Sequence, residues 1–76
     1  MSERAIKDLK ENIRDEEREF NGYVRDLSRH LSASSGNVGS TPRRVIITDT
    51  RNYLKRLEKC DENLRDYESK LNKLLR

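Results

Sequence analysis

The sequence offers little material for a large hydrophobic core. It contains no tryptophan, one phenylalanine and three tyrosines, and apolar residues make up 32% of its 76 positions. That share is far below the roughly 45–50% that is usual in globular domains. A short chain also buries a smaller fraction of its surface than a long one. Two alternatives remain, a disordered chain or an elongated helical structure with a narrow core.

The residue types that support catalysis and ligand binding are equally scarce. His30 is the only histidine and Cys60 the only cysteine, so the chain has no His/Cys cluster with metal-ligand spacing. A nucleophile and its base must also lie within hydrogen-bond reach of each other. Gly36 and Gly39 lack the Lys-Ser/Thr pair of a phosphate-binding loop. We therefore expect no enzymatic activity, no catalytic residue, no metal site and no cofactor, with Cys60 serving as a small apolar core residue.

Signals for export or membrane insertion are absent too. The first ten residues, MSERAIKDLK, contain no apolar stretch that could form the core of a signal peptide. No segment approaches the ~18 consecutive apolar residues of a membrane span. A single cysteine cannot form a disulfide within the chain. These features predict a cytoplasmic (intracellular) protein with no membrane span.

One segment interrupts an otherwise uniform composition. Residues 32–42, SASSGNVGSTP, hold two of the three glycines and the only proline. They predict a single helical-hairpin domain over residues 1–76, with a helix at about 3–33, a Gly/Ser/Pro turn at about 34–41 and a helix at about 42–75. Ser2 is the expected N-cap of the first helix. Thr41 is the expected N-cap of the second, with Pro42 in its first helical position.

Apolar residues recur at helical spacing on both sides of this turn. In the first helix they are Ile6, Leu9, Ile13, Phe20, Val24, Leu27 and Leu31. In the second helix a heptad runs through Ile46, Thr50, Tyr53, Leu57, Cys60, Leu64, Tyr67, Leu71 and Leu74. Steps of four and three sustained over this length are typical of a coiled coil. The predicted fold is all-α, with two long helices forming an antiparallel coiled-coil hairpin and these residues forming its seam.

Two positions disturb the seam of the first helix. Glu16 and Glu17 fall where an apolar residue is expected, opposite Cys60 and Asp61, and we expect both carboxylates to flank the seam in water. Gly22 lies within the helical pattern, where glycine costs about 0.5–1 kcal/mol relative to alanine. A bend or a close approach of the second helix would account for it.

Basic residues form a stripe on the second helix, roughly opposite its apolar seam. They are Arg44, Arg51, Lys55 and Lys59. The stripe is either part of a solvated coiled-coil surface or a docking face for an acidic protein. Nucleic acid is a remote third partner, because the interleaved acidic residues would oppose phosphate binding.

The pattern resembles a known family of helical hairpins. The segments LKENIRDEEREFNGYVRDL, GSTPRR and YLKRLEKCDENLRDYESKLNKLL are similar to the REM repeat, the homology region 1 hairpin of Rho effectors. Gly22 stands near the glycine of that family's first helix, and Leu57, Leu64 and Leu71 match its second-helix ladder. The resemblance implies an antiparallel coiled coil that binds a GTP-loaded Rho-family GTPase in signal transduction. The segment REFNGYVRDL keeps little of the family's pattern beyond the glycine, so no contact residue is transferred.

The chain also resembles the N-terminal coiled-coil hairpin of hantavirus-type nucleocapsid proteins. This second resemblance implies self-association within a larger assembly. Ile47, Leu54 and Leu75 widen the apolar stripe of the second helix and could supply the contact. Small scaffolds often gain stability by oligomerising. If the chain functions by self-association, we therefore expect weak homo-oligomerisation.

Overall fold

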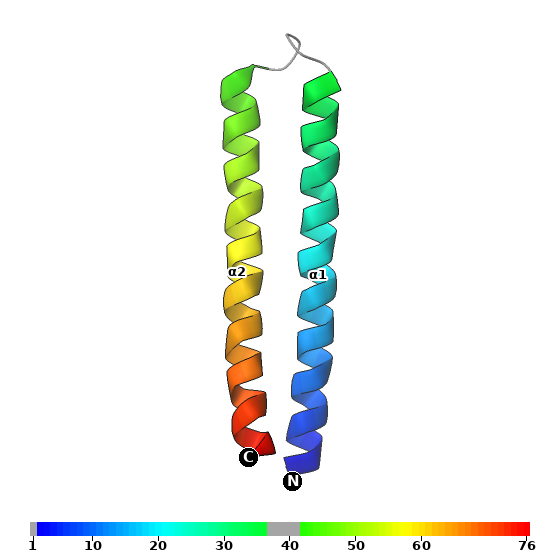
Figure 1. Cartoon of the computed structure of the whole chain (residues 1–76), viewed down its shortest axis with the longest axis vertical. Coiled ribbons are helices and arrows are strands. Elements are labelled where there is room, and N and C mark those ends of the chain that lie inside the picture. The colour runs from blue at the N-terminus through cyan, green and yellow to red at the C-terminus, as the bar shows by residue number, and fades with distance from the viewer. Residues whose placement is uncertain (1, 37–41) are drawn as a thin grey trace.

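Two long helices lie side by side in the computed structural model, which describes residues 2–36 and 42–76. Helix α1 spans Ser2–Gly36 and helix α2 spans Arg43–Leu75. They run in opposite directions and pack against each other along their length, so the beginning of α1 lies beside the end of α2 (Figure 1). The molecule measures 58 × 15 × 13 Å. The predicted all-α antiparallel hairpin is confirmed.

The helix boundaries differ from the prediction at three places. Helix α1 begins at Ser2, so this serine lies in the first turn and does not precede it, and it continues to Gly36. Helix α2 begins at Arg43, one residue later than predicted, because Pro42 has ψ 137°, which is outside the helical range. The Pro42 carbonyl accepts hydrogen bonds from the backbone N–H groups of Val45 (3.0 Å) and Ile46 (3.3 Å). Pro42 is therefore the N-cap residue, while Thr41 lies outside the described residues.

The β-branched residues at the start of α2 are helical despite their lower propensity. Thr50 shows how a polar β-branched residue is accommodated at a half-buried position. Its hydroxyl donates a hydrogen bond of 2.7 Å to the Ile46 carbonyl one turn earlier. This hydroxyl is therefore satisfied within its own helix and needs no partner from α1.

The face that α1 turns toward α2 is shifted from the predicted seam. A regular heptad of half-buried residues runs through Ile6, Leu9, Ile13, Glu16, Phe20, Tyr23, Leu27, His30 and Ser34. Tyr23 and His30 occupy the places predicted for Val24 and Leu31, which are 40% and 43% exposed. The steps from Glu16 to Ser34 alternate between four and three residues, which keeps the 3.5-residue period that a coiled coil requires.

The seam of α2 follows its predicted heptad more closely. Ile46, Thr50, Tyr53, Leu57, Leu64, Tyr67 and Leu71 are half-buried, and Cys60 is buried. Leu74, the last predicted member, is 40% exposed near the end of the helix. Cys60 is the only buried hydrophobic residue in the described part of the chain. The hairpin is therefore held together by a single narrow line of contacts.

Gly22 has open space beside it. A Cβ atom built at this position meets no atom of the packed neighbours within 4 Å. Of the two explanations considered for this glycine, a bend or a close approach of α2, the close approach is therefore wrong. The residue lies inside the continuous helix α1, where its backbone freedom in the unfolded chain lowers stability.

We expect Gly22→Ala to stabilise the hairpin by about 0.5–1 kcal/mol, because it reduces backbone entropy in the unfolded state without a clash. Thermal unfolding followed by circular dichroism measures the effect, expected as a rise in Tm of about 4–8 °C per kcal/mol. An unchanged or lower Tm would contradict this prediction and would show that the helix requires glycine here for a reason other than close packing.

Candidate functional site

A polar layer crosses the seam at the middle of the hairpin. The Asn63 side-chain amide donates a hydrogen bond of 2.9 Å to the Glu16 carboxylate across the two helices. Burial, and then a hydrogen bond with Glu16, raises the pKa of the Cys60 thiol above its ordinary value. Glu16 is half-buried and faces α2, so the expectation that its carboxylate lies in water beside the seam is wrong, whereas Glu17 is exposed.

We infer that this layer favours one register of the two helices at some cost in stability. We expect Glu16→Leu to raise the free energy of unfolding by at most about 1 kcal/mol. A half-buried leucine gains part of the roughly 1.5–3 kcal/mol that full burial contributes to the free energy of unfolding. Losing the hydrogen bond lowers it by about 0.5–1.5 kcal/mol. Asn63 is itself half-buried and retains access to water. Urea denaturation measures this effect, with Glu17→Leu as the control. The control should not stabilise the hairpin, because residue 17 is exposed. Equal effects of the two substitutions would contradict the assignment of Glu16 to the polar layer.

Aromatic and polar side chains gather along one side of the seam, toward the turn. The Arg56 guanidinium lies 5.7 Å from the ring centres of both Tyr23 and Tyr53. The His30 and Tyr53 rings are 5.9 Å apart. His30 Nε2 lies 3.9 Å from an Asp49 carboxylate oxygen and is shielded from solvent without a hydrogen bond to the described residues. This side is therefore filled by cross-helix contacts.

The opposite side of the hairpin carries exposed apolar residues. Val24 and Leu31 on α1, and Ile47 and Leu54 on α2, are 40–48% exposed. Each follows a seam-facing residue by one position, and one residue turns about 100° around a helix. Because the helices are antiparallel, the same turn carries all four to the same side of the hairpin. We call these four residues the apolar side face.

Charge is unevenly divided between the two ends of the hairpin. Residues 18–56, which we call the turn half, carry eight basic and three acidic side chains, a net charge of +5. Residues 1–17 and 57–76, the end half, carry nine basic and eleven acidic side chains, a net charge of −2. The apolar side face lies entirely within the turn half. The apolar side face therefore lies in the positively charged part of the molecule, whereas Leu74 and Leu75, which are 40% and 59% exposed, lie in the end half.

The predicted basic stripe belongs mainly to this turn half. All four of its residues are exposed on α2. At 100° per residue, Arg44 and Arg51 lie next to the apolar side face, and Lys55 and Lys59 continue the stripe around the outside of the helix. The stripe therefore borders the apolar side face along one edge.

Ion pairing differs between the two halves. In the end half, Arg65 and Lys70 reach the carboxylates of Asp61 and Asp66 at 3.1 and 2.9 Å, and Lys59 reaches Glu62 at 3.8 Å. Within the described residues, Arg44, Arg51 and Lys55 form no such ion pair. The cations beside the apolar side face are thus available to an external carboxylate.

The start of α2 also departs from ordinary helix design. Its first turn contains no acidic residue, and Pro42 supplies no side-chain cap. Arg43 and Arg44 stand instead at the positive end of the helix dipole, where a nearby cation is unfavourable by about 0.3–1 kcal/mol. Such a local conflict is expected where a residue serves binding more than folding.

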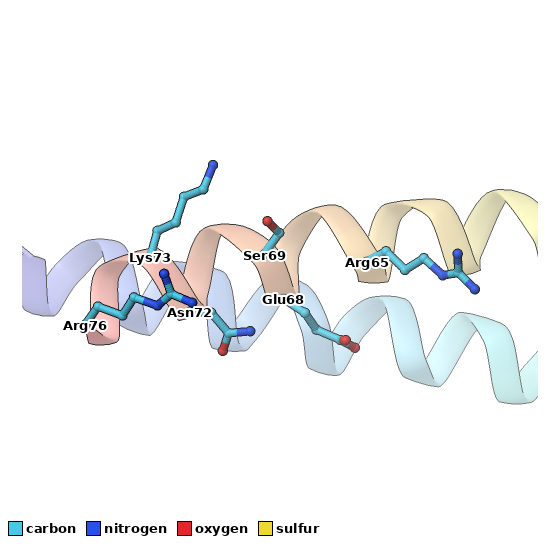
Figure 2. Close-up of a pocket in the computed structure, with 6 residues that line it drawn as sticks. All are labelled: Arg65, Glu68, Ser69, Asn72, Lys73 and Arg76. Carbon is cyan, nitrogen blue, oxygen red and sulfur yellow. The ribbon is translucent and has the colours of Figure 1, made fainter.

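A hollow lies at the far end of α2. Figure 2 shows the six residues that line it, Arg65, Glu68, Ser69, Asn72, Lys73 and Arg76. All belong to α2 except Arg76, which follows it, and in Figure 2 Lys73 and Arg65 extend in different directions. The hollow is therefore an open stretch of helix surface, not a site where groups converge.

Comparisons with known proteins add no assignment. No protein-family model matches the sequence, and neither the curated proteins nor the solved structures give a significant match. Among the described residues, no group of three or more His, Cys, Asp or Glu side chains could hold a metal ion. Neither α1 nor α2 is long and apolar enough to cross a membrane.

Proposed function

We propose that this hairpin is a non-enzymatic protein–protein interaction module that binds an acidic partner through its turn half. The observation that carries the proposal is the coincidence of the apolar side face with cations that form no ion pair within the described residues, namely Arg44, Arg51 and Lys55. Apolar contacts supply affinity, whereas complementary charge supplies orientation and a fast association rate. The outer surface of a packed hairpin needs neither feature to fold.

The first candidate partner is a GTP-loaded Rho-family GTPase. The support for this choice is the resemblance of the sequence to the REM repeat, whose hairpin architecture the chain shares. A module that reports the state of a GTPase must bind its GTP form more tightly than its GDP form, since only differential affinity distinguishes two states.

Calorimetric titration against Rho-, Rac- and Cdc42-type proteins tests this candidate. We expect binding to at least one GTP-loaded protein, at least tenfold tighter than to its GDP form, a difference of about 1.4 kcal/mol. No heat with any GTP-loaded protein, at concentrations that would detect tens of micromolar affinity, would remove the GTPase and leave self-association as the leading function.

Self-association is the second candidate, and the exposed surface of the chain favours it. The hairpin exposes 6258 Å², whereas a compact protein of 9.0 kDa exposes about 4,850 Å². The excess, roughly 1,400 Å², exceeds the ~800 Å² that each partner of a standard interface buries. Sedimentation equilibrium that fits a single 9.0 kDa species at high concentration would exclude this candidate.

A further inference from the structure

We propose that the apolar side face binds an acidic amphipathic helix of the partner protein. This inference rests on the proposed role in protein binding, but not on the identity of the partner as a GTPase. It specifies the element that docks, the place where it docks and the charge that it carries.

The shape of the face fits a helix. Val24 and Leu31 are one heptad apart on α1, and Ile47 and Leu54 are one heptad apart on α2. The contact between His30 and Asp49 places the second turn of α2 level with the part of α1 around residue 30. Leu31 is therefore level with Ile47, and Val24 with Leu54. A helix lying along the seam on this side contacts both rows and completes a local three-helix bundle.

The length of the face limits the docked segment. Seven residues rise about 10.5 Å along a helix. One heptad farther from the turn, Glu17 and Asp61 take the corresponding places on α1 and α2, and both are exposed. Their carboxylates end the apolar surface. We therefore infer a footprint of about two to three helical turns, confined to the turn half.

The charge around the face selects an acidic helix. Arg44 and Arg51 border the apolar side face on α2, and neither forms an ion pair within the described part of the chain. A second copy of the hairpin docked symmetrically on this face would bring two turn halves of net charge +5 together. Like charges placed across an interface oppose binding, so a partner with flanking carboxylates is favoured over a second copy.

Two synthetic peptides test the proposal on the intact chain. One is an amphipathic helix of about five turns, or 18 residues, with leucines on one face and glutamates beside them. The matched peptide has lysine in place of each glutamate. Fluorescence anisotropy of labelled peptide should show at least tenfold tighter binding of the acidic peptide. Equal affinities, tighter binding of the basic peptide or no binding of the acidic one would overturn the proposal.

Matched variants locate the contact. Ile47→Gln together with Leu54→Gln should weaken binding of the acidic peptide at least tenfold. Val45→Gln should leave it unchanged, because Val45 is similarly exposed (44%) but precedes the seam residue Ile46 and so lies away from the face. Circular dichroism checks that each variant stays helical. Equal losses in the double variant and the control would overturn the assignment of the face.

Self-association through the apolar side face must be distinguished from binding of an acidic helix. If the chain alone dimerises in sedimentation experiments, and only the Ile47/Leu54 double variant abolishes the dimer, a second copy occupies the face and the acidic-helix proposal is wrong. Failure of the GTPase titration together with binding of the acidic peptide removes the GTPase alone and keeps the face.

Discussion

Leu57→Asp is expected to unfold the hairpin. Leu57 is half-buried at the middle of the α2 seam, three residues before Cys60, the only buried core residue among those that the structure describes. The substitution removes leucine burial, which costs about 2–5 kcal/mol when leucine is replaced by alanine in a core. It also places an unpaired carboxylate among apolar groups. Since one line of contacts holds the helices, no other core can compensate, and circular dichroism should show loss of cooperative thermal unfolding.

Leu54→Asp is the matched control for this change. It introduces the same carboxylate three residues earlier, on a side chain that is 48% exposed. We expect this variant to remain helical with a cooperative transition close to that of the natural chain. If Leu57→Asp unfolds at the same temperature as Leu54→Asp, the seam does not carry the stability of the hairpin.

Arg51→Glu combined with Lys55→Glu is expected to weaken binding of the partner at least tenfold, about 1.4 kcal/mol. The two changes lower the net charge of the turn half from +5 to +1 without touching the seam. Both residues are exposed, and neither is paired within the described residues, so helicity should be retained. Calorimetry with the GTP-loaded protein that binds the natural chain most tightly measures the loss.

Salt and a second charge reversal serve as controls for that experiment. Association of the natural chain should slow as salt is added, whereas the double variant should respond less, because screening acts on the steering charges. Lys73→Glu with Arg76→Glu makes the same total change in charge in the end half. Comparable losses of affinity in both double variants would mean that net charge, and not the turn half, determines binding.

The fold was predictable because the heptad of α2 is strong. Its seam positions are occupied mostly by Leu, Ile and Tyr, so the period of 3.5 residues is visible without structural information. The glycines and proline between the helices also indicated where the chain reverses, but of the predicted turn at about 34–41, residues 34–36 belong to α1 and residues 37–41 lie outside the described residues. The exact beginning of α2 was not predictable, because it depends on the ψ angle of Pro42. Proline restricts φ but leaves ψ free to be helical or extended.

The seam of α1 was harder to predict for a physical reason. Val24 and Leu31 are more hydrophobic than their neighbours Tyr23 and His30, so a hydrophobicity pattern selects the wrong pair. The packed residues are the two rings, whose polar ends reach Glu19 and Asp49 while their apolar bodies face the other helix. Displacing Val24 and Leu31 from the seam is what creates the apolar side face.

The polar layer was also beyond the sequence pattern. Glu16 and Asn63 are 47 positions apart, and neither belongs to the apolar repeat. Their hydrogen bond depends on the register of the two helices, which must be known before the pair can be proposed. The basic stripe was visible in the sequence, but its position beside the apolar side face required the antiparallel geometry.

Amide chemical-shift mapping tests most directly the claim that the turn half is the binding surface. The isotopically labelled chain is titrated with the acidic amphipathic peptide and, in parallel, with the GTP-loaded GTPase that gives the strongest calorimetric response. We predict shifts concentrated in residues 21–31 of α1 and 44–55 of α2, around the apolar side face. Shifts confined to residues 2–17 and 57–76, or absent with both ligands, would contradict the account.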